Sequence, residues 1–335
     1  MRPASRCIRR RRTDRQSHRL IRNRPAPNDG AGDDILACEG TNVELLAYAV
    51  MGGILYGIFF TLVGLGLNLV FGVMRIINLA HGQFIVLGSY AAWMVSHHFG
   101  LSPLWAIPVS VAAAAIIGWP MYRAVVPRLQ RSDDPEMLSF ILFFGIGQML
   151  ESLTVLMFGA DQRSLPDDAL GSGNLGAFGQ QFPDSWWWAA GISVAALVVL
   201  WLYFSRTRFG YATRAVMANR EEAVATGIDV RRVSTIAFVA GLALAGIAGV
   251  FVPYLLGSVS PDLGDNLTTT AFAIVVIGSL GNPLGTIAGG LVFGLGTMLM
   301  QTYYSSWSNV VPYALLLIIV LIRPSGLLGK AVRLA

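Results

Sequence analysis

The stretch LLAYAVMGGILYGIFFTLVGLGLNLVFGVM, residues 45–74, contains no charged side chain. An α-helix needs about 20 apolar residues to cross the hydrocarbon core of a membrane, so this run is long enough for one crossing. Further uncharged runs cover residues 76–122, 185–205, 233–261 and 266–322 of the 335-residue chain. With 54% hydrophobic residues and a mean hydropathy of +0.59, the sequence predicts an all-α polytopic membrane protein.

We expect nine membrane spans from these runs. The run 266–322 exceeds a single crossing and must fold back, with breaks at GNPLG (281–285) and YYSSWSN (303–309). The span at 268–280 is short, which favours a broken or tilted helix. The expected spans are 45–66, 76–96, 102–122, 138–158, 186–204, 234–257, 268–280, 284–303 and 309–322.

Lysine and arginine are distributed unevenly among the loops. Loops 123–137 and 205–233 and the C-terminal segment 323–335 are basic, whereas loop 159–185 has one arginine and loop 258–267 has none. Cytoplasmic loops carry an excess of these residues, so we expect the three basic segments and the C-terminus to be cytoplasmic.

The first 42 residues differ from the rest of the chain. They contain ten arginines, five acidic residues and both cysteines, while the remaining residues carry no net charge. Counting the spans backwards from the basic loops places this tail on the external side of the membrane. Its ten arginines would instead favour the cytoplasmic side, as in the other loops. We interpret residues 1–42 as disordered or as a misassigned start, with translation beginning near Val43 and a permease body at 43–335. A missed span and a translocated tail are the alternatives.

Sequence motifs of enzymes are absent from the chain. It contains no GxxxxGK[ST] phosphate loop, no HExxH and no GxSxG, and its four histidines are scattered. We therefore expect neither a catalytic site nor a metal site. Membrane lipid is an expected partner of the body, and nucleic acid is not.

Glycine and alanine recur every four residues in the apolar runs, as at Gly241, Ala245 and Gly249 and at Gly281, Gly285 and Gly289. Small residues at this spacing let helix backbones approach each other in lipid. These positions predict helix packing rather than a ligand site.

Polar residues interrupt two apolar runs. Asn78, His81 and Gln83 lie in RIINLAHGQF (75–84), which forms either a tight turn at the cytoplasmic surface or a discontinuous helix lining a pathway. Gln148 and Glu151 are three residues apart and share one helix face, and Glu151 lies about 20 Å along a span that starts near Leu138. They make either a packing hydrogen bond or part of a transport route.

The basic loop contains GYATRAVMANREEAVATGIDVRRV, residues 210–233. Asn219 and Glu222 have the spacing of a capping box, and Gly227 suits the left-handed residue that ends a helix. We expect a helix over residues 220–226, too short to be stable alone. Small side chains such as Ala223 would admit close approach of a partner. The alternative is an ordinary solvated loop helix.

Four separated segments resemble the permease subunits of branched-chain amino-acid ABC importers. These are GLNLVFGVMRIINLAHGQFIVLGSYAA, the loop stretch above continued as STIAFVAGLALAGIAGV, IGSLGNPLGTIAGGLVFG and LLLIIVLIRPSGLLG. The resemblance runs from Val43 to Gly329, and INLAHG is more similar to the first of the two permease types. The tail 1–42 has no counterpart in that pattern.

The resemblance implies a type II ABC-importer-like permease fold with about eight to nine spans in the bacterial inner (plasma) membrane. It implies four partner chains: a second permease subunit, in a heterodimer or a homodimer, two cytoplasmic ATPases and a periplasmic or extracellular substrate-binding protein. The ATPases would use ATP and Mg²⁺, while this chain would bind no cofactor. Loop 205–233 would be the cytoplasmic coupling loop. The candidate coupling residues are Gly210, Arg214, Ala215, Asn219, Glu222, Ala223 and Gly227, and the candidate pathway residues are Asn78, His81, Gln83, Gln148 and Glu151.

The resemblance leaves the substrate open between branched-chain or other apolar amino acids and urea, short amides or aromatic acids. A different class, the ATP-independent secondary transporter or channel, commonly shows inverted repeats and intramembrane charges. The sequence offers one candidate charge and no clear repeat.

Overall fold

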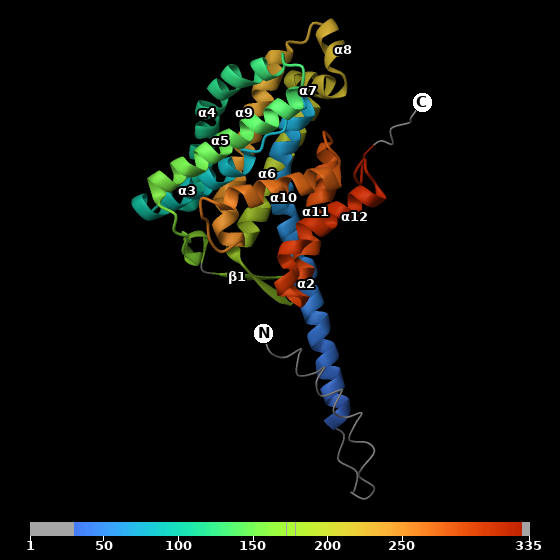
Figure 1. Ribbon diagram of the computed structural model, residues 1–335. Helices are drawn as coiled ribbons and strands as arrows, with labels where there is room; N and C mark the ends of the chain where they lie inside the picture. Colours follow the sequence, from blue (N-terminus) through green and yellow to red (C-terminus); the bar gives the residue numbers. More distant parts are fainter. Residues whose placement is uncertain (1–29, 172, 178, 330–335) are drawn as a thin grey trace, which may run out of the picture.

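The computed structural model describes residues 30–171, 173–177 and 179–329 (Figure 1). The helices are α2 (Gly30–Met74), α3 (His81–Phe99), α4 (Ala106–Leu129), α5 (Pro135–Phe158), α6 (Asp184–Arg206), α7 (Arg208–Ala218), α8 (Arg220–Ala225), α9 (Val230–Leu255), α10 (Leu263–Gly278), α11 (Pro283–Tyr303) and α12 (Val311–Ile322). Three short 3₁₀ helices cover Pro103–Trp105, Asp167–Leu170 and Ser305–Val310. Strands β1 (Asn174–Ala177) and β2 (Gln180–Pro183) form an antiparallel hairpin with Leu175 opposite Phe182.

Each of the nine expected apolar segments contains a helix, but the helices differ in length. Among the described residues, six are long and apolar enough to cross a membrane: Glu44–Met74 of α2, Pro103–Leu129, α5, α6, α9 and α11. The 16-residue α10 and the 12-residue α12 are only about 24 and 18 Å long, less than a core of about 30 Å. The six crossings include neither the expected span 76–96, where α3 begins only at His81, nor 309–322, for which α12 is too short, so these two expectations are corrected. The expectation of a short helix at 268–280 agrees with α10.

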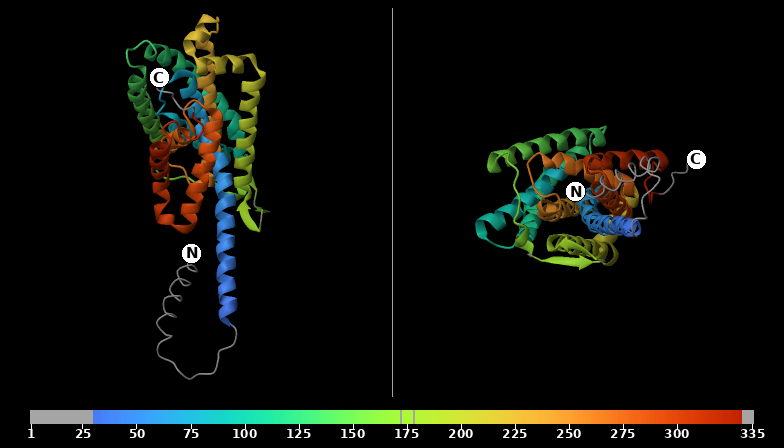
Figure 2. Two further views of the ribbon diagram at one scale, coloured as in Figure 1. Left: turned by 90° about the vertical axis from the view of Figure 1, so that its right-hand side faces the viewer. Right: turned by 90° about the horizontal axis from the view of Figure 1, so that it is seen from below.

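Helix α2 runs through the centre of the body, packed against α9 and α11 (Figures 1 and 2). A Cβ added to Gly294 of α11 would lie 2.2 Å from the backbone nitrogen of Gly57 in α2. On the α9 side, a Cβ added to Gly241 would lie 2.7 Å from the carbonyl oxygen of Gly66. The glycines therefore bring helix backbones into contact, and the expected packing role is confirmed.

The loops divide between the two ends of the body. The basic loops after α4 and around α8 share one end, where Arg220 Nη2 donates to Gln130 Oε1 at 2.8 Å. The hairpin occupies the other end. There the backbones of Arg163 and Val259 form an antiparallel bridge, and this bridge joins the two arginine-poor loops, 159–185 and 258–267. We call these the α8 end and the hairpin end. The grouping of basic loops agrees with the sequence, and which end is cytoplasmic stays a prediction.

The first turns of α2 project beyond the other helices at the hairpin end (Figure 2). Residues 1–29 of the arginine-rich tail lie outside the described residues, while residues 30–42 continue α2. The expected start near Val43 stays a prediction.

Replacing Gly88 with leucine should destabilise the fold. A Cβ at this position in α3 would lie 2.2 Å from the carbonyl oxygen of Gly246 in α9, so the two backbones must separate. Overpacking of this kind costs about 1–3 kcal/mol or more. Gly145→Leu in α5 is the matched control, since its added Cβ meets nothing within 4 Å. Melting temperature in detergent should fall for Gly88→Leu alone, and equal melting of the two variants would contradict the packing.

Candidate functional site

The chain between α2 and α3 re-enters the body instead of turning at its surface. Helix α2 ends at Met74 and α3 begins at His81, whose Nε2 lies 3.0 Å from the carbonyl oxygen of Val63. Val63 precedes Met74 by about 16 Å along the helix axis. His81 therefore lies about 16 Å back from the end of α2. Residues 75–80 can span about 20 Å when extended, so they reach this position by running back along α2. The structure therefore has a discontinuous segment here, beginning at Arg75 with a left-handed φ of 52°.

The polar side chains of this segment are enclosed. Asn78 and His81 are fully buried; Asn78 Oδ1 accepts a hydrogen bond from the Ala80 nitrogen at 3.1 Å. The segment also docks on α10, because the Gly82 nitrogen donates to Thr268 Oγ1 at 2.9 Å. A Cβ at Gly82 would lie 1.9 Å from the Gly264 carbonyl oxygen, so only glycine fits. Asn78 and His81 thus hold the segment in place, and their predicted role in a pathway stays a prediction.

Three other predicted residues meet in one polar cluster. Gln83 Nε2 donates to Glu151 Oε2 at 3.4 Å, and Gln148 Nε2 lies 3.5 Å from the same oxygen. Gln148 Nε2 also lies 3.5 Å from Asp265 Oδ2 at the start of α10. We call Gln83, Gln148, Glu151 and Asp265 the polar cluster. Asp265 was missed by the sequence reasoning, although it is the last charge before the long uncharged run 266–322.

The polar cluster lies within a membrane-spanning region. Glu151 precedes the end of α5 at Phe158 by about 10 Å along the helix, on the side of the hairpin end. Gln83 is buried, Gln148 and Glu151 are half-buried, and Asp265 is exposed in this chain. Ionised carboxylates facing hydrocarbon are costly, so these groups require water, protein or a ligand beside them.

The predicted helix in the basic loop is confirmed. Helix α8 covers Arg220–Ala225, and Asn219 Oδ1 accepts from the backbone nitrogens of Glu221 at 3.0 Å and Glu222 at 3.4 Å. Asn219 Nδ2 donates to Glu222 Oε1 at 2.7 Å, so the two side chains are paired as the spacing indicated. Gly227 has a φ of 82°, and Ile228 donates back to the Ala223 carbonyl, which completes a Schellman ending.

Two predicted coupling residues lie inside the chain. Ala223 is only 3% exposed, because α8 rests on its own chain through this side, so its assignment as a contact for a partner is corrected. Gly210 is buried where a Cβ would lie 1.9 Å from the Tyr203 carbonyl oxygen, at the junction of α6 and α7. Both residues fix the position of α7 and α8. Sequence spacing alone could not distinguish the inner face of so short a helix from its outer face.

The outer surface near α8 carries the other predicted residues. Arg214 is exposed and stacks over the Tyr211 ring at 4.8 Å, while Ala215 is half-buried. Asn219, Glu222 and Gly227 are exposed. The sequence reasoning missed Val224, an apolar side chain that is 58% exposed on the outer face of α8. We call the outer face of α8, formed by Glu221, Glu222, Val224 and Ala225, the α8 face.

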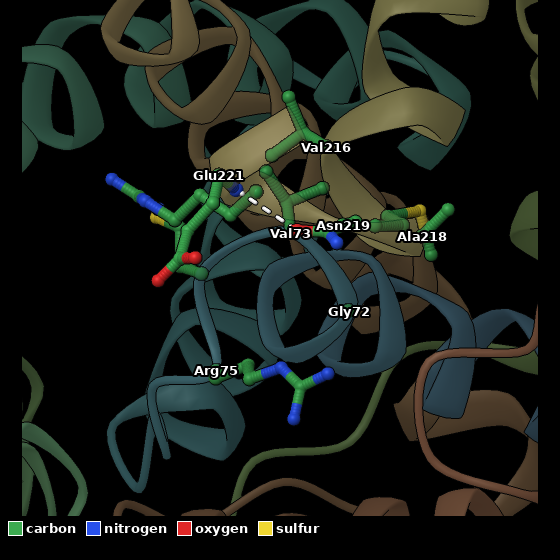
Figure 3. A pocket seen from close by; sticks show the side chains of 10 residues that line it. Gly72, Val73, Arg75, Val216, Ala218, Asn219 and Glu221 are labelled. Atoms are coloured by element: carbon green, nitrogen blue, oxygen red, sulfur yellow. Dashed lines mark hydrogen bonds between the residues drawn. The ribbon is translucent and has the colours of Figure 1, made fainter. Parts of the chain in front are cut away.

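A cavity of about 390 Å³ lies between the α7–α8 junction and the end of α2 (Figure 3). Residues 72–75 form one wall and residues 216–221 form the other. Arg75 and Glu221 are among the residues that line it, so the cavity adjoins both the start of α8 and the start of the re-entrant segment.

Comparison with known proteins identifies the family. Residues 49–320 match the family model described as "Branched-chain amino acid transport system / permease component". The chain belongs to this permease family. This confirms the resemblance found in the sequence and identifies the chain as a multi-pass membrane transport component rather than an enzyme.

Named relatives include permeases of both types. The chain is 28% identical to the high-affinity branched-chain amino acid transport system permease protein LivH of Salmonella typhimurium, over 84% of this chain and 94% of the relative. It is 29% identical to a probable LivH permease of Methanocaldococcus jannaschii, over 83% and 91% of the two chains. The LivM permease of Escherichia coli is 26% identical, over 80% of this chain and 67% of its own length. No solved structure matches.

Replacing Asn219 with alanine should loosen α8. The change removes the acceptor for two backbone nitrogens, which costs about 1 kcal/mol, and so should speed amide exchange in residues 220–228 about fivefold. Asn219→Ser, which keeps an acceptor, is the control and should retain protection. Hydrogen–deuterium exchange measures the effect, and equal exchange in Asn219→Ala and the wild type would show that the cap does not hold the helix.

Proposed function

We propose that this chain is one of two permease subunits of an ATP-driven importer for branched-chain or other apolar amino acids. In this proposal the α8 face docks on a separate ATPase, and the substrate passes the polar cluster. The α8 end faces the cytoplasm, together with the C-terminus. The observation that carries the proposal is α8 itself, a short helix that is capped at both ends and fixed on the body with its outer face uncovered.

Helix α8 is built as a rigid contact element. A six-residue helix has no stability of its own, yet Ala223 packs it on the chain and Arg220 ties it to Gln130. The exposed Val224 side chain is surrounded by charged neighbours, which matches the apolar centre and polar rim of protein interfaces. Because α8 is already ordered before it docks, binding loses less conformational entropy.

The ATP chemistry is assigned to partner chains. Since the full sequence has no phosphate-binding loop, we propose that two ATPase subunits supply ATP and Mg²⁺ binding and that this chain binds no cofactor. A substrate-binding protein would deliver the amino acid at the hairpin end.

The second permease subunit is proposed to be of the LivM type. LivH and LivM relatives are both named as permeases of a high-affinity branched-chain amino acid transport system. The half-exposed polar cluster supports this pairing, because a second subunit would enclose a hydrated route beside Glu151 and Asp265 and keep hydrocarbon away from them.

Uptake of radiolabelled leucine into proteoliposomes tests the proposal. Liposomes containing both permeases and the ATPases, with binding protein outside and ATP inside, should accumulate leucine. Omitting the ATPases should abolish accumulation. Uptake that proceeds without them would identify an ATP-independent transporter instead.

Replacing Val224 with glutamate should weaken ATPase docking. Placing a charge at the centre of the α8 face removes an apolar contact and should cost at least about 2 kcal/mol, which is about 30-fold in affinity. Leu175→Glu at the hairpin end is the matched control, because Leu175 is 55% exposed and Val224 is 58% exposed. Co-purification with the ATPase in detergent, without binding protein, measures docking. Equal recovery of the two variants would exclude the α8 face as the docking site.

A further inference from the structure

Gln83 has an unused hydrogen-bond acceptor inside the polar cluster. Its side chain is 1% exposed, and its Nε2 donates to Glu151 Oε2 at 3.4 Å. The Oε1 atom of the same amide has no partner. A buried carbonyl oxygen without a donor is unfavourable, and native structures seldom leave one unless a ligand or water completes it.

The position of this amide is fixed by its neighbour on α10. A Cβ added to Gly264 would lie 2.4 Å from Gln83 Cδ and 2.8 Å from Oε1. Because Gly264 has no side chain, the Gln83 amide has space to lie next to Glu151. The unused acceptor is a built feature of the packing between α3 and α10.

The cluster is negatively charged and has few free donors. Gln148 Nε2 lies 3.5 Å from both Glu151 Oε2 and Asp265 Oδ2, so these two oxygens are no more than 7.0 Å apart. Within the described ranges, no basic side chain lies within 4.0 Å of either carboxylate. The amide nitrogens of Gln83 and Gln148 are already directed at carboxylate oxygens. What the cluster lacks is a cation with several donors.

A primary ammonium group has the complementary chemistry. It carries one positive charge and three N–H donors, matching Glu151, Asp265 and Gln83 Oε1. A metal ion fits less well, because in the part of the chain that the structure describes no three histidine, cysteine or acidic side chains are grouped to hold one. We propose that the polar cluster binds the protonated amino group of the amino acid in transit.

This inference rests on the proposed function and adds the substrate group that is recognised. Glu151 lies toward the hairpin end, where the substrate would enter. The cluster would accept an amino acid through its ammonium group and would give the corresponding 2-oxo acid or alcohol no comparable contact. The permease itself would then contribute to selection by functional group, whatever the length of the side chain.

Thermal stabilisation of the two-permease complex in detergent tests binding directly. The probe is 3-methylbutylammonium, which has the leucine side chain and an ammonium group, and the comparison is 3-methylbutan-1-ol. We expect the amine to raise the melting temperature of the wild-type complex in a saturable manner and the alcohol to have no such effect. Equal shifts in melting temperature with the two compounds, measured on the wild-type complex alone, would overturn the inference.

Variants then assign the binding to the cluster. Glu151→Gln and Gln83→Leu should each weaken the response to the amine by about tenfold or more, as loss of a charge-assisted or buried hydrogen bond does. Gly264→Ala should also weaken it by displacing the Gln83 amide. Asp133→Asn is the control, since Asp133 is an exposed carboxylate in the α4–α5 loop at the α8 end.

Leucine uptake separates the inference from the proposed function. Uptake that depends on ATP and remains at the wild-type rate in Glu151→Gln and Gln83→Leu would overturn the ammonium site and leave the importer intact. Amine binding that requires Glu151, in a complex whose uptake does not depend on ATP, would support the site and overturn the proposed function. Glu151→Asp, which keeps the charge, should restore part of the response if Glu151→Gln assembles poorly.

Discussion

Direct contact between helix backbones holds this chain together. Lipid provides no hydrophobic drive for helices to associate, so close packing has to provide the attraction. Glycines lie where the helices cross, as at Gly57 with Gly294 and at Gly66 with Gly241. Each crossing fixes the depth and the rotation of one helix against another, because a shift of one residue would place a side chain where no space exists.

The re-entrant segment depends on this arrangement. Residues 75–80 return along α2 into a place where Gly82 lies against the backbone of Gly264 at the start of α10. The same contact brings Gln83 into reach of Glu151 on α5. The close approach of two glycine backbones thus helps to bring together a polar cluster that three helices contribute.

Local features of the sequence predicted much of this structure. The ends of α8 followed from Asn219 and Gly227, because capping involves residues within four positions of each other. The pairing of Gln148 with Glu151 followed from helix periodicity. Long-range packing could not be predicted in this way. Neither the burial of Ala223 nor the addition of Asp265 to the cluster is determined by nearby residues, since each depends on where another helix lies.

The cavity between the α7–α8 junction and the end of α2 lies beside a direct contact between its two walls. Protein interiors are close-packed, so a helix within one seldom shifts unless its neighbours repack. Here the two facing walls, Gly72–Arg75 and Val216–Glu221, have about 390 Å³ of open space between them. At Gly72, an added Cβ would lie 2.5 Å from Met217 Cε, so the two walls touch there. A displacement of α8 would therefore act on the end of α2 through Met217, while the side chains beside this contact have space to adjust.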